Sequence, residues 1–118
     1  MSDQARVLSN KHCVPCEGGM PPLTPDEYNR LLNETPDWQV IEQKQIQRDF
    51  KFKDFKKALE FVNKVGEIAE NEGHHPDINL HNWNRVQITL STHVIKGLSE
   101  NDFIMASKID QQLPPINS

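Results

Sequence analysis

The chain has 118 residues, which is enough for one domain and short for two. Its net charge is −4 and both signs are interspersed, so direct binding to nucleic acid is not expected. The apolar runs are only a few residues long and the first residues lack the apolar core of a signal peptide, so we expect a cytoplasmic protein with no membrane span.

Residues 1–23 are rich in glycine and proline and have little periodicity, so we expect an extended arm on the surface of a single domain over residues 24–118. The arm holds both cysteines, Cys13 and Cys16. This spacing fits half a zinc site, a redox pair or two surface thiols. We favour the thiols, because no second cysteine pair exists and loop-forming residues follow.

The domain is predicted to begin with a short helix and a hairpin. Thr24 and Glu27 form a capping box for a helix over residues 25–33, with proline at its first position. Residues 38–41 and the alternating residues 46–52 read as two strands that pair.

A longer helix should follow, capped by Asp54 and ending near Gly73. Its apolar residues recur at three- and four-residue intervals, which is typical of a buried helical face. We expect this face to comprise Phe55, Leu59, Val62, Val65, Ile68 and Ala69.

The last part is predicted to be a second hairpin and a third helix. Strands cover residues 78–81 and 85–92, with a turn at 82–84, and the second strand alternates apolar and polar residues up to His93 on its polar face. Ser99 and Asp102 form another capping box, for a helix reaching Leu113.

The order α-β-β-α-β-β-α predicts an α+β fold. We expect a four-stranded antiparallel sheet with three helices packed on one face and the other face open.

Three of the five histidines are the candidate site: adjacent His74 and His75, and His93 one hairpin downstream. Histidine exchanges protons near neutrality, so the cluster indicates acid/base chemistry or a metal. Two further interpretations stay open at this point. The pair can simply interact with the helix end, or all three can bind zinc, although adjacent histidines seldom reach one ion.

Four segments give the chain a family resemblance: His74-His75-Pro76-Asp77-Ile78, Trp83-Asn84-Arg85-Val86, Thr89-Leu90-Ser91-Thr92-His93 and the run from Gly97 to Phe103. In this order and spacing, over about residues 23–110, they resemble the pterin-4a-carbinolamine dehydratases. The resemblance implies dimers or pairs of dimers, a pterin substrate, and no metal or cofactor.

The implied activity is that of a hydro-lyase, which dehydrates 4a-hydroxytetrahydrobiopterin to quinonoid dihydropterin during tetrahydrobiopterin recycling. His74, His75 and His93 are the implied catalytic residues: His74 and His93 transfer protons and His75 also orients the pterin, with acid and base roles open. Glu70 and Asp102 are implied to hold imidazoles or contact the ring.

The chain departs from the animal members at three places. Gly73 replaces an aspartate, Asn101 replaces an arginine, and no aromatic residue directly follows the histidine pair. We therefore expect Trp83 to serve as the residue that stacks on the pterin.

Two alternative functions remain. One is a non-catalytic dimerisation or coactivator module, and the other is a protein that binds a different pterin, such as a molybdenum cofactor precursor.

Overall fold

The computed structural model describes residues 8–15 and 18–113. Three helices, α1 (Pro25–Leu32), α2 (Phe55–Glu72) and α3 (Glu100–Asp110), accompany four strands, β1 (Gln39–Ile41), β2 (Gln45–Lys51), β3 (Asp77–His81) and β4 (Arg85–Leu90). Short 3-10 helices lie at Leu8–Asn10 (η2) and His93–Ile95 (η3). The predicted order of helices and strands is confirmed.

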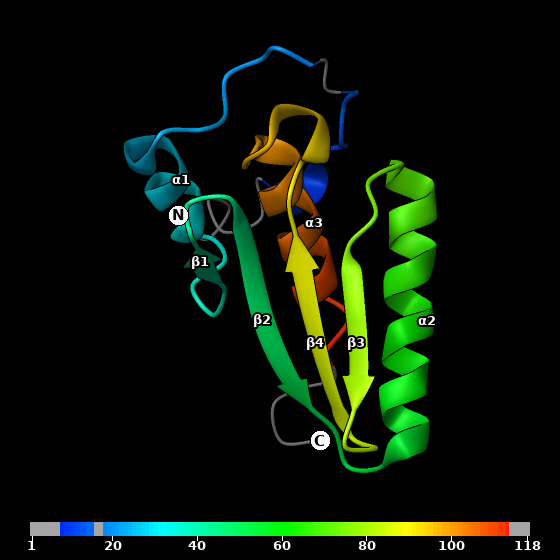
Figure 1. Ribbon diagram of the computed structural model, residues 1–118. Coiled ribbons are helices and arrows are strands. Elements are labelled where there is room, and N and C mark those ends of the chain that lie inside the picture. The colour runs from blue at the N-terminus through cyan, green and yellow to red at the C-terminus, as the bar shows by residue number, and fades with distance from the viewer. Residues whose placement is uncertain (1–7, 16–17, 114–118) are drawn as a thin grey trace.

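The strands form one antiparallel sheet in the order β1-β2-β4-β3, with both predicted hairpins present. Figure 1 shows α2 running beside β3 and α3 behind β4. The helix-covered face carries fully buried apolar residues, while the opposite face is polar. The buried side chains of this sheet face are Ile46, Phe50, Val86, Ile88 and Leu90.

Both predicted capping boxes are present. Thr24 Oγ1 accepts from the Glu27 amide, and at α3 Ser99 and Asp102 form the second box. A cap satisfies amides at the helix start that have no partner within the helix. The start of each of these helices is therefore determined locally.

The predicted buried face of α2 is partly wrong. Val65 and Ala69 are buried as expected, but Phe55 is 49% exposed and Leu59 is 39% exposed. The helix instead contacts the core through a stripe that includes Ala58 and Phe61. The buried residues Ala58, Phe61, Val65 and Ala69 recur at three- and four-residue intervals, so they form one helical face, and Phe55 and Leu59 lie outside it.

Two predicted ends are also corrected. The last strand stops at Leu90, because the chain folds back through Lys96 (φ 55°) and the Thr92 amide bonds to the Gly97 carbonyl at 2.9 Å. His93 therefore begins η3 and does not continue the strand. Helix α3 ends at Asp110, and Leu113 packs on the core from beyond it.

The described part of the predicted arm does more than cover the surface. Leu8 is 1% exposed and belongs to the core, where η2 packs against α3. The Ser9 carbonyl accepts from Lys108 on that helix. The domain boundary at residue 24 stays a prediction. Among the described residues, no helix is long and apolar enough to cross a membrane.

Because Leu8 fills core space, Leu8→Ala should reduce the free energy of unfolding by about 2–4 kcal/mol. Urea unfolding followed by circular dichroism measures this change. Val14→Ala is the matched control, since Val14 is 64% exposed, and should change stability by less than about 0.5 kcal/mol. Equal midpoints for Leu8→Ala and the wild type would show that the arm does not contribute to the core.

Candidate active site

The three candidate histidines line one cavity of about 460 Å³. His74 and His75 follow the end of α2, and His93 begins η3 after β4. These two chain segments lie at the same end of the sheet, at the top of Figure 1. The fold thus brings together the residues that the sequence separates by one hairpin.

The backbone at the histidine pair is held by its neighbours. Gly73 adopts a left-handed conformation (φ 68°) and its amide donates to the Ala69 carbonyl at 2.9 Å, which ends α2. Pro76 then restricts His75 to extended backbone conformations. The two imidazoles consequently leave the chain in different directions and find different partners.

His74 is held by a buried carboxylate. Its Nε2 lies 2.7 Å from Asp102 Oδ1, with the His74 side chain 12% exposed and that of Asp102 fully buried. The other Asp102 oxygen accepts from Thr92 Oγ1 at 2.9 Å and from the Ser99 amide at 3.0 Å. Because Asp102 is enclosed behind His74, we assign it to positioning the imidazole, and direct contact with a substrate, which the sequence also allowed, is not supported.

The other two histidines have different surroundings. His75 Nε2 lies 2.6 Å from Glu70 Oε2, and this pair is largely exposed. His93 is exposed, and among the described residues its ring has no hydrogen-bond partner. Two histidines are thus oriented by carboxylates, while the third is free to meet a ligand.

The segment of residues 13–15 forms a wall of the cavity, although no pattern in the sequence places it there. Cys13, Val14 and Pro15 line it together with the histidines. Asn101 holds this wall through both backbone groups of Val14. Its Oδ1 accepts from the Val14 amide at 3.0 Å, and its Nδ2 donates to the Val14 carbonyl at 2.6 Å.

Asn101 is thus one side chain that clamps this segment by hydrogen bonds to its backbone, and Glu72 is a second such clamp. It accepts from the Cys13 amide at 2.7 Å, lies 2.9 Å from His12 Nδ1 and faces Lys108 at 3.6 Å. Burial acts to raise the pKa of Glu72, but the bond from the Cys13 amide, the bond from His12 and the charge of Lys108 outweigh it and lower the pKa below 4.5. No local sequence pattern predicts either clamp, because Glu72 is about 60 residues from Cys13 and Asn101 is 87 residues from Val14.

Trp83 is the candidate residue that the fold does not bring to the site. It lies in the β3–β4 turn with φ 54° and is 60% exposed. The strands between this turn and the histidines, β3 and β4, advance about 3.3 Å per residue, so Trp83 is on the order of 20 Å from the histidines. The interpretation of Trp83 as a stacking residue is therefore not supported within one chain.

Of the two cysteines, Cys13 lines the cavity and Cys16 lies outside the described residues, so the interpretation of the pair as surface thiols stays a prediction. Over residues 8–15 and 18–113, no group of three or more His, Cys, Asp or Glu side chains is arranged to hold a metal ion.

Comparisons with known proteins match most of this chain. The family model described as pterin 4 alpha carbinolamine dehydratase matches residues 21–112. A protein of Rubrobacter xylanophilus, provisionally named pterin-4-alpha-carbinolamine dehydratase, is 49% identical over 88% of this chain and 96% of its own length. A protein of Alkaliphilus metalliredigens with the same provisional name is 50% identical over 89% of this chain and 95% of its own length.

Solved structures agree in fold. The crystal structure of a transcriptional coactivator/pterin dehydratase from Brucella melitensis superposes with a TM-score of 0.71 at 38% identity, covering 76% of this chain and 96% of that one. A pterin dehydratase-like protein, identified as a RuBisCO assembly factor in the alpha-carboxysome, has a TM-score of 0.55 over 64% of this chain and 87% of its own. At 23% identity this second likeness shows the fold alone.

The lowered pKa of Glu72 predicts that the stabilisation contributed by this carboxylate depends on pH. Above pH 4.5 the ionised carboxylate contributes its full stabilisation, and this contribution is lost as the pH falls through the lowered pKa. Glu72→Gln should therefore unfold about 1–3 kcal/mol more easily than the wild type at pH 7, with the gap closing below pH 4.5.

Urea midpoints at pH 7, 4.5 and 3 test this prediction. Glu67→Gln, an exposed substitution on the same helix, should leave stability nearly unchanged at each pH. A gap for Glu72→Gln that stays constant with pH would contradict a role for the ionised carboxylate.

Proposed function

The chain belongs to the pterin 4 alpha carbinolamine dehydratase family, and on this premise we propose that it dehydrates 4a-hydroxytetrahydrobiopterin to quinonoid dihydropterin and water. The observation that carries the proposal is the shared cavity of His74, His75 and His93, with His74 backed by buried Asp102. The proposed physiological role is recycling of tetrahydrobiopterin.

The proposed reaction is a balanced elimination of water. The C4a–O bond breaks as its oxygen receives a proton and leaves as water. The proton on N5 passes to a base, and the N–H electron pair becomes the second bond between C4a and N5. Both steps need a group that exchanges protons near neutral pH, and each positioned transfer is worth about 10² to 10⁴ in rate.

We assign the base to His74. Asp102 accepts three hydrogen bonds, so the proton between it and His74 belongs on the imidazole Nε2. A neutral imidazole with a protonated Nε2 keeps an unprotonated Nδ1, which is the atom that removes the N5 proton. Its orientation is held by a carboxylate that is itself fixed in the core.

His93 is then the acid that protonates the leaving oxygen. Its ring is exposed and has no carboxylate partner among the described residues, so it exchanges protons with solvent between turnovers. His75, which is 62% exposed and oriented by Glu70, is assigned to binding and orienting the pterin.

The decay of the 4a-carbinolamine tests these roles. His74→Ala and His93→Ala should each lower the enzyme-catalysed rate about 10²- to 10⁴-fold. His75→Ala should chiefly raise KM. His81→Ala is the matched control, because His81 lies on β3 outside the cavity, and its rate should equal that of the wild type.

If the rate of carbinolamine decay were unchanged in both His74→Ala and His93→Ala, the proposed dehydratase activity would be wrong. If calorimetry then also showed no binding of a dihydropterin, the association role in the name of the Brucella protein would become the better proposal. Tight binding of another pterin without dehydration would favour the alternative ligand.

We also propose that two or more copies associate. Strand β3 forms one edge of the sheet, and an open edge offers unpaired backbone groups to another chain. Ile78 on this edge is 36% exposed, and Phe55 and Leu59 lie one turn apart on the exposed face of α2. Neighbouring exposed apolar side chains such as Phe55 and Leu59 are favoured at protein–protein interfaces, and a second copy would bury them.

Light scattering during gel filtration should therefore give a mass of at least twice 13.6 kDa. The double variant Phe55→Lys, Leu59→Lys should shift the protein toward monomer, while Val94→Lys, equally apolar and exposed at the other end of the fold, should not. A monomeric wild type would refute association, and an unaffected double variant would refute this surface.

A further inference from the structure

A second cavity of about 420 Å³ lies at the end of the sheet opposite the histidines. It is enclosed by the β2–α2 connection, one side of α2 and the residues after α3. Lys51, at its edge, pairs with Arg85 at the start of β4, whereas the histidine site lies beyond the end of that strand. The proposed dehydration uses none of the residues that line this second cavity.

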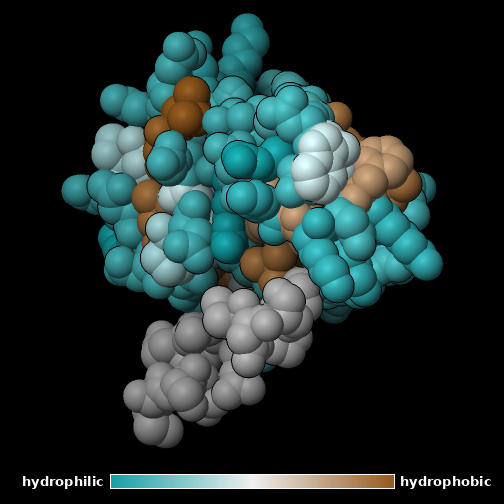
Figure 2. Space-filling view, turned by 90° about the horizontal axis from the view of Figure 1, so that it is seen from below, coloured by the Kyte–Doolittle hydropathy of each residue, from teal (hydrophilic) through white to brown (hydrophobic). Residues whose placement is uncertain are grey.

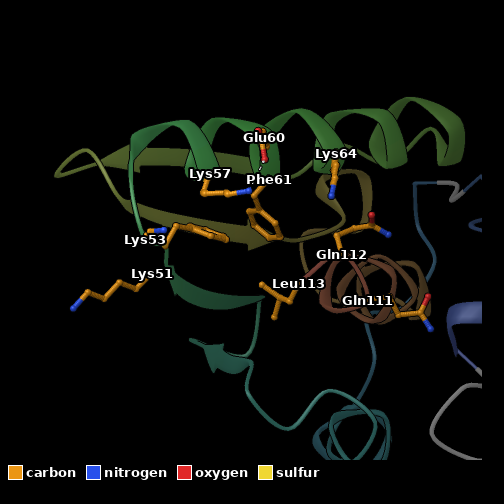
Figure 3. A pocket seen from close by; sticks show the side chains of 10 residues that line it. Lys51, Lys53, Lys57, Glu60, Phe61, Lys64, Gln111, Gln112 and Leu113 are labelled. Atoms are coloured by element: carbon orange, nitrogen blue, oxygen red, sulfur yellow. Dashed lines mark ion pairs between the residues drawn. The ribbon is translucent and has the colours of Figure 1, made fainter. Parts of the chain in front are cut away.

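The interior of the cavity is aromatic and apolar. Figure 3 shows Phe61 pointing down from α2 toward Leu113. The Phe61 and Phe52 ring centroids are 4.9 Å apart, with the ring planes inclined by 39°. Seen from below, the molecule has a mostly hydrophilic surface on which hydrophobic residues lie in several separate patches (Figure 2). Phe61 is only 3% exposed and also packs on Phe50, so the partly buried ring of Phe52 and the side chain of Leu113 are the apolar surfaces that a ligand can reach.

The rim is strongly basic. Four of its lining residues are lysines and one is acidic, although the whole chain has a net charge of −4. The acid, Glu60, lies 3.7 Å from Lys57. Lys53 and Lys64 have no hydrogen bond or ion pair among the described residues. Like charges placed together without acidic partners repel one another, and an anion relieves that repulsion.

We propose that this pocket binds a small organic anion, with a flat aromatic body against Phe52 and Leu113 and a phosphate or carboxylate attracted by the positive charges of Lys53 and Lys64. The volume lies within the 300–1,000 Å³ typical of pockets for small ligands. It is too small for a helix or strand of another protein, and four lysines on a short rim do not form the extended track that a polyanion needs. In Figure 3 Lys64 points toward Gln112 at the pocket, while Lys51 extends away from it.

Phenyl phosphate is the probe, titrated into the full chain and followed by amide chemical shifts. The expected result is saturable shifts confined to residues 51–64 and 111–113. Benzoate should bind the same residues, which tests the carboxylate form, while phenol and inorganic phosphate should each bind at least about tenfold more weakly, because each supplies only one half of the ligand.

Charge-removing variants locate the anion. Lys53→Gln and Lys64→Gln should each weaken phenyl phosphate binding about three- to tenfold, and added salt should reduce the difference. Lys56→Gln is the matched control, since Lys56 is exposed on the same helix but does not line the pocket, and its affinity should stay within about twofold of the wild type. The rate of carbinolamine decay should be unchanged in all three variants. Failure of the anion-binding proposal can therefore be distinguished from failure of the proposed dehydratase activity.

Three results would overturn the proposal. One is equal weakening by Lys56→Gln, which would show a diffuse effect of charge. Another is a set of shifts centred on the histidine cavity. The third is binding of long-chain polyphosphate without measurable binding of phenyl phosphate, which would assign the lysines to a macromolecular polyanion.

Discussion

The buried carboxylate of Asp102 is the constraint on which the rest of the site depends. A carboxylate removed from water is costly unless hydrogen bonds replace its hydration, and Asp102 is fully enclosed. Its three donors come from three parts of the chain: the α3 cap at Ser99, the segment after β4 at Thr92, and the segment after α2 at His74. Satisfying one buried charge therefore fixes three chain segments relative to one another.

This arrangement joins folding to chemistry. One oxygen of Asp102 completes the capping box that starts α3, and the other orients the imidazole of His74. A substitution at this position would remove a helix cap and a histidine support together. Effects on activity and on stability would then be correlated at Asp102, whereas at exposed His93 they would separate.

Local signals explain how much of the fold was predictable. The capping boxes at Thr24 and Ser99, the glycine stop at Gly73 and the alternation in β4 each depend on neighbours in the sequence, and all are present. The histidine cluster was also predictable, because a hairpin returns the chain to where it began. The face of α2 was not, since its orientation depends on contacts with distant residues, such as the packing of Phe61 against Phe50 and Phe52.

What the sequence could not reveal depends on contacts between distant segments. Leu8 in the core is one example, and the clamps from Asn101 and Glu72 to the segment around Cys13 are others. Trp83 shows the opposite error: it follows the histidine pair closely in sequence, yet an extended strand carries it to the far end of the sheet. Short sequence separation implies proximity in a turn or helix, but not along a strand.

The two ends of the sheet differ in charge, and this difference separates their chemistry. At the histidine end, Asp102 and Glu70 contact His74 and His75, and Glu72 lines the same cavity, so negative charges there oppose the binding of an anion. Lysines surround the opposite cavity and favour anions. Since β2 and β4 span the whole distance between the two cavities, a ligand at one end makes no contact with a ligand at the other. Any coupling between the two cavities would have to pass through the packed sheet or along α2, which contributes residues to both.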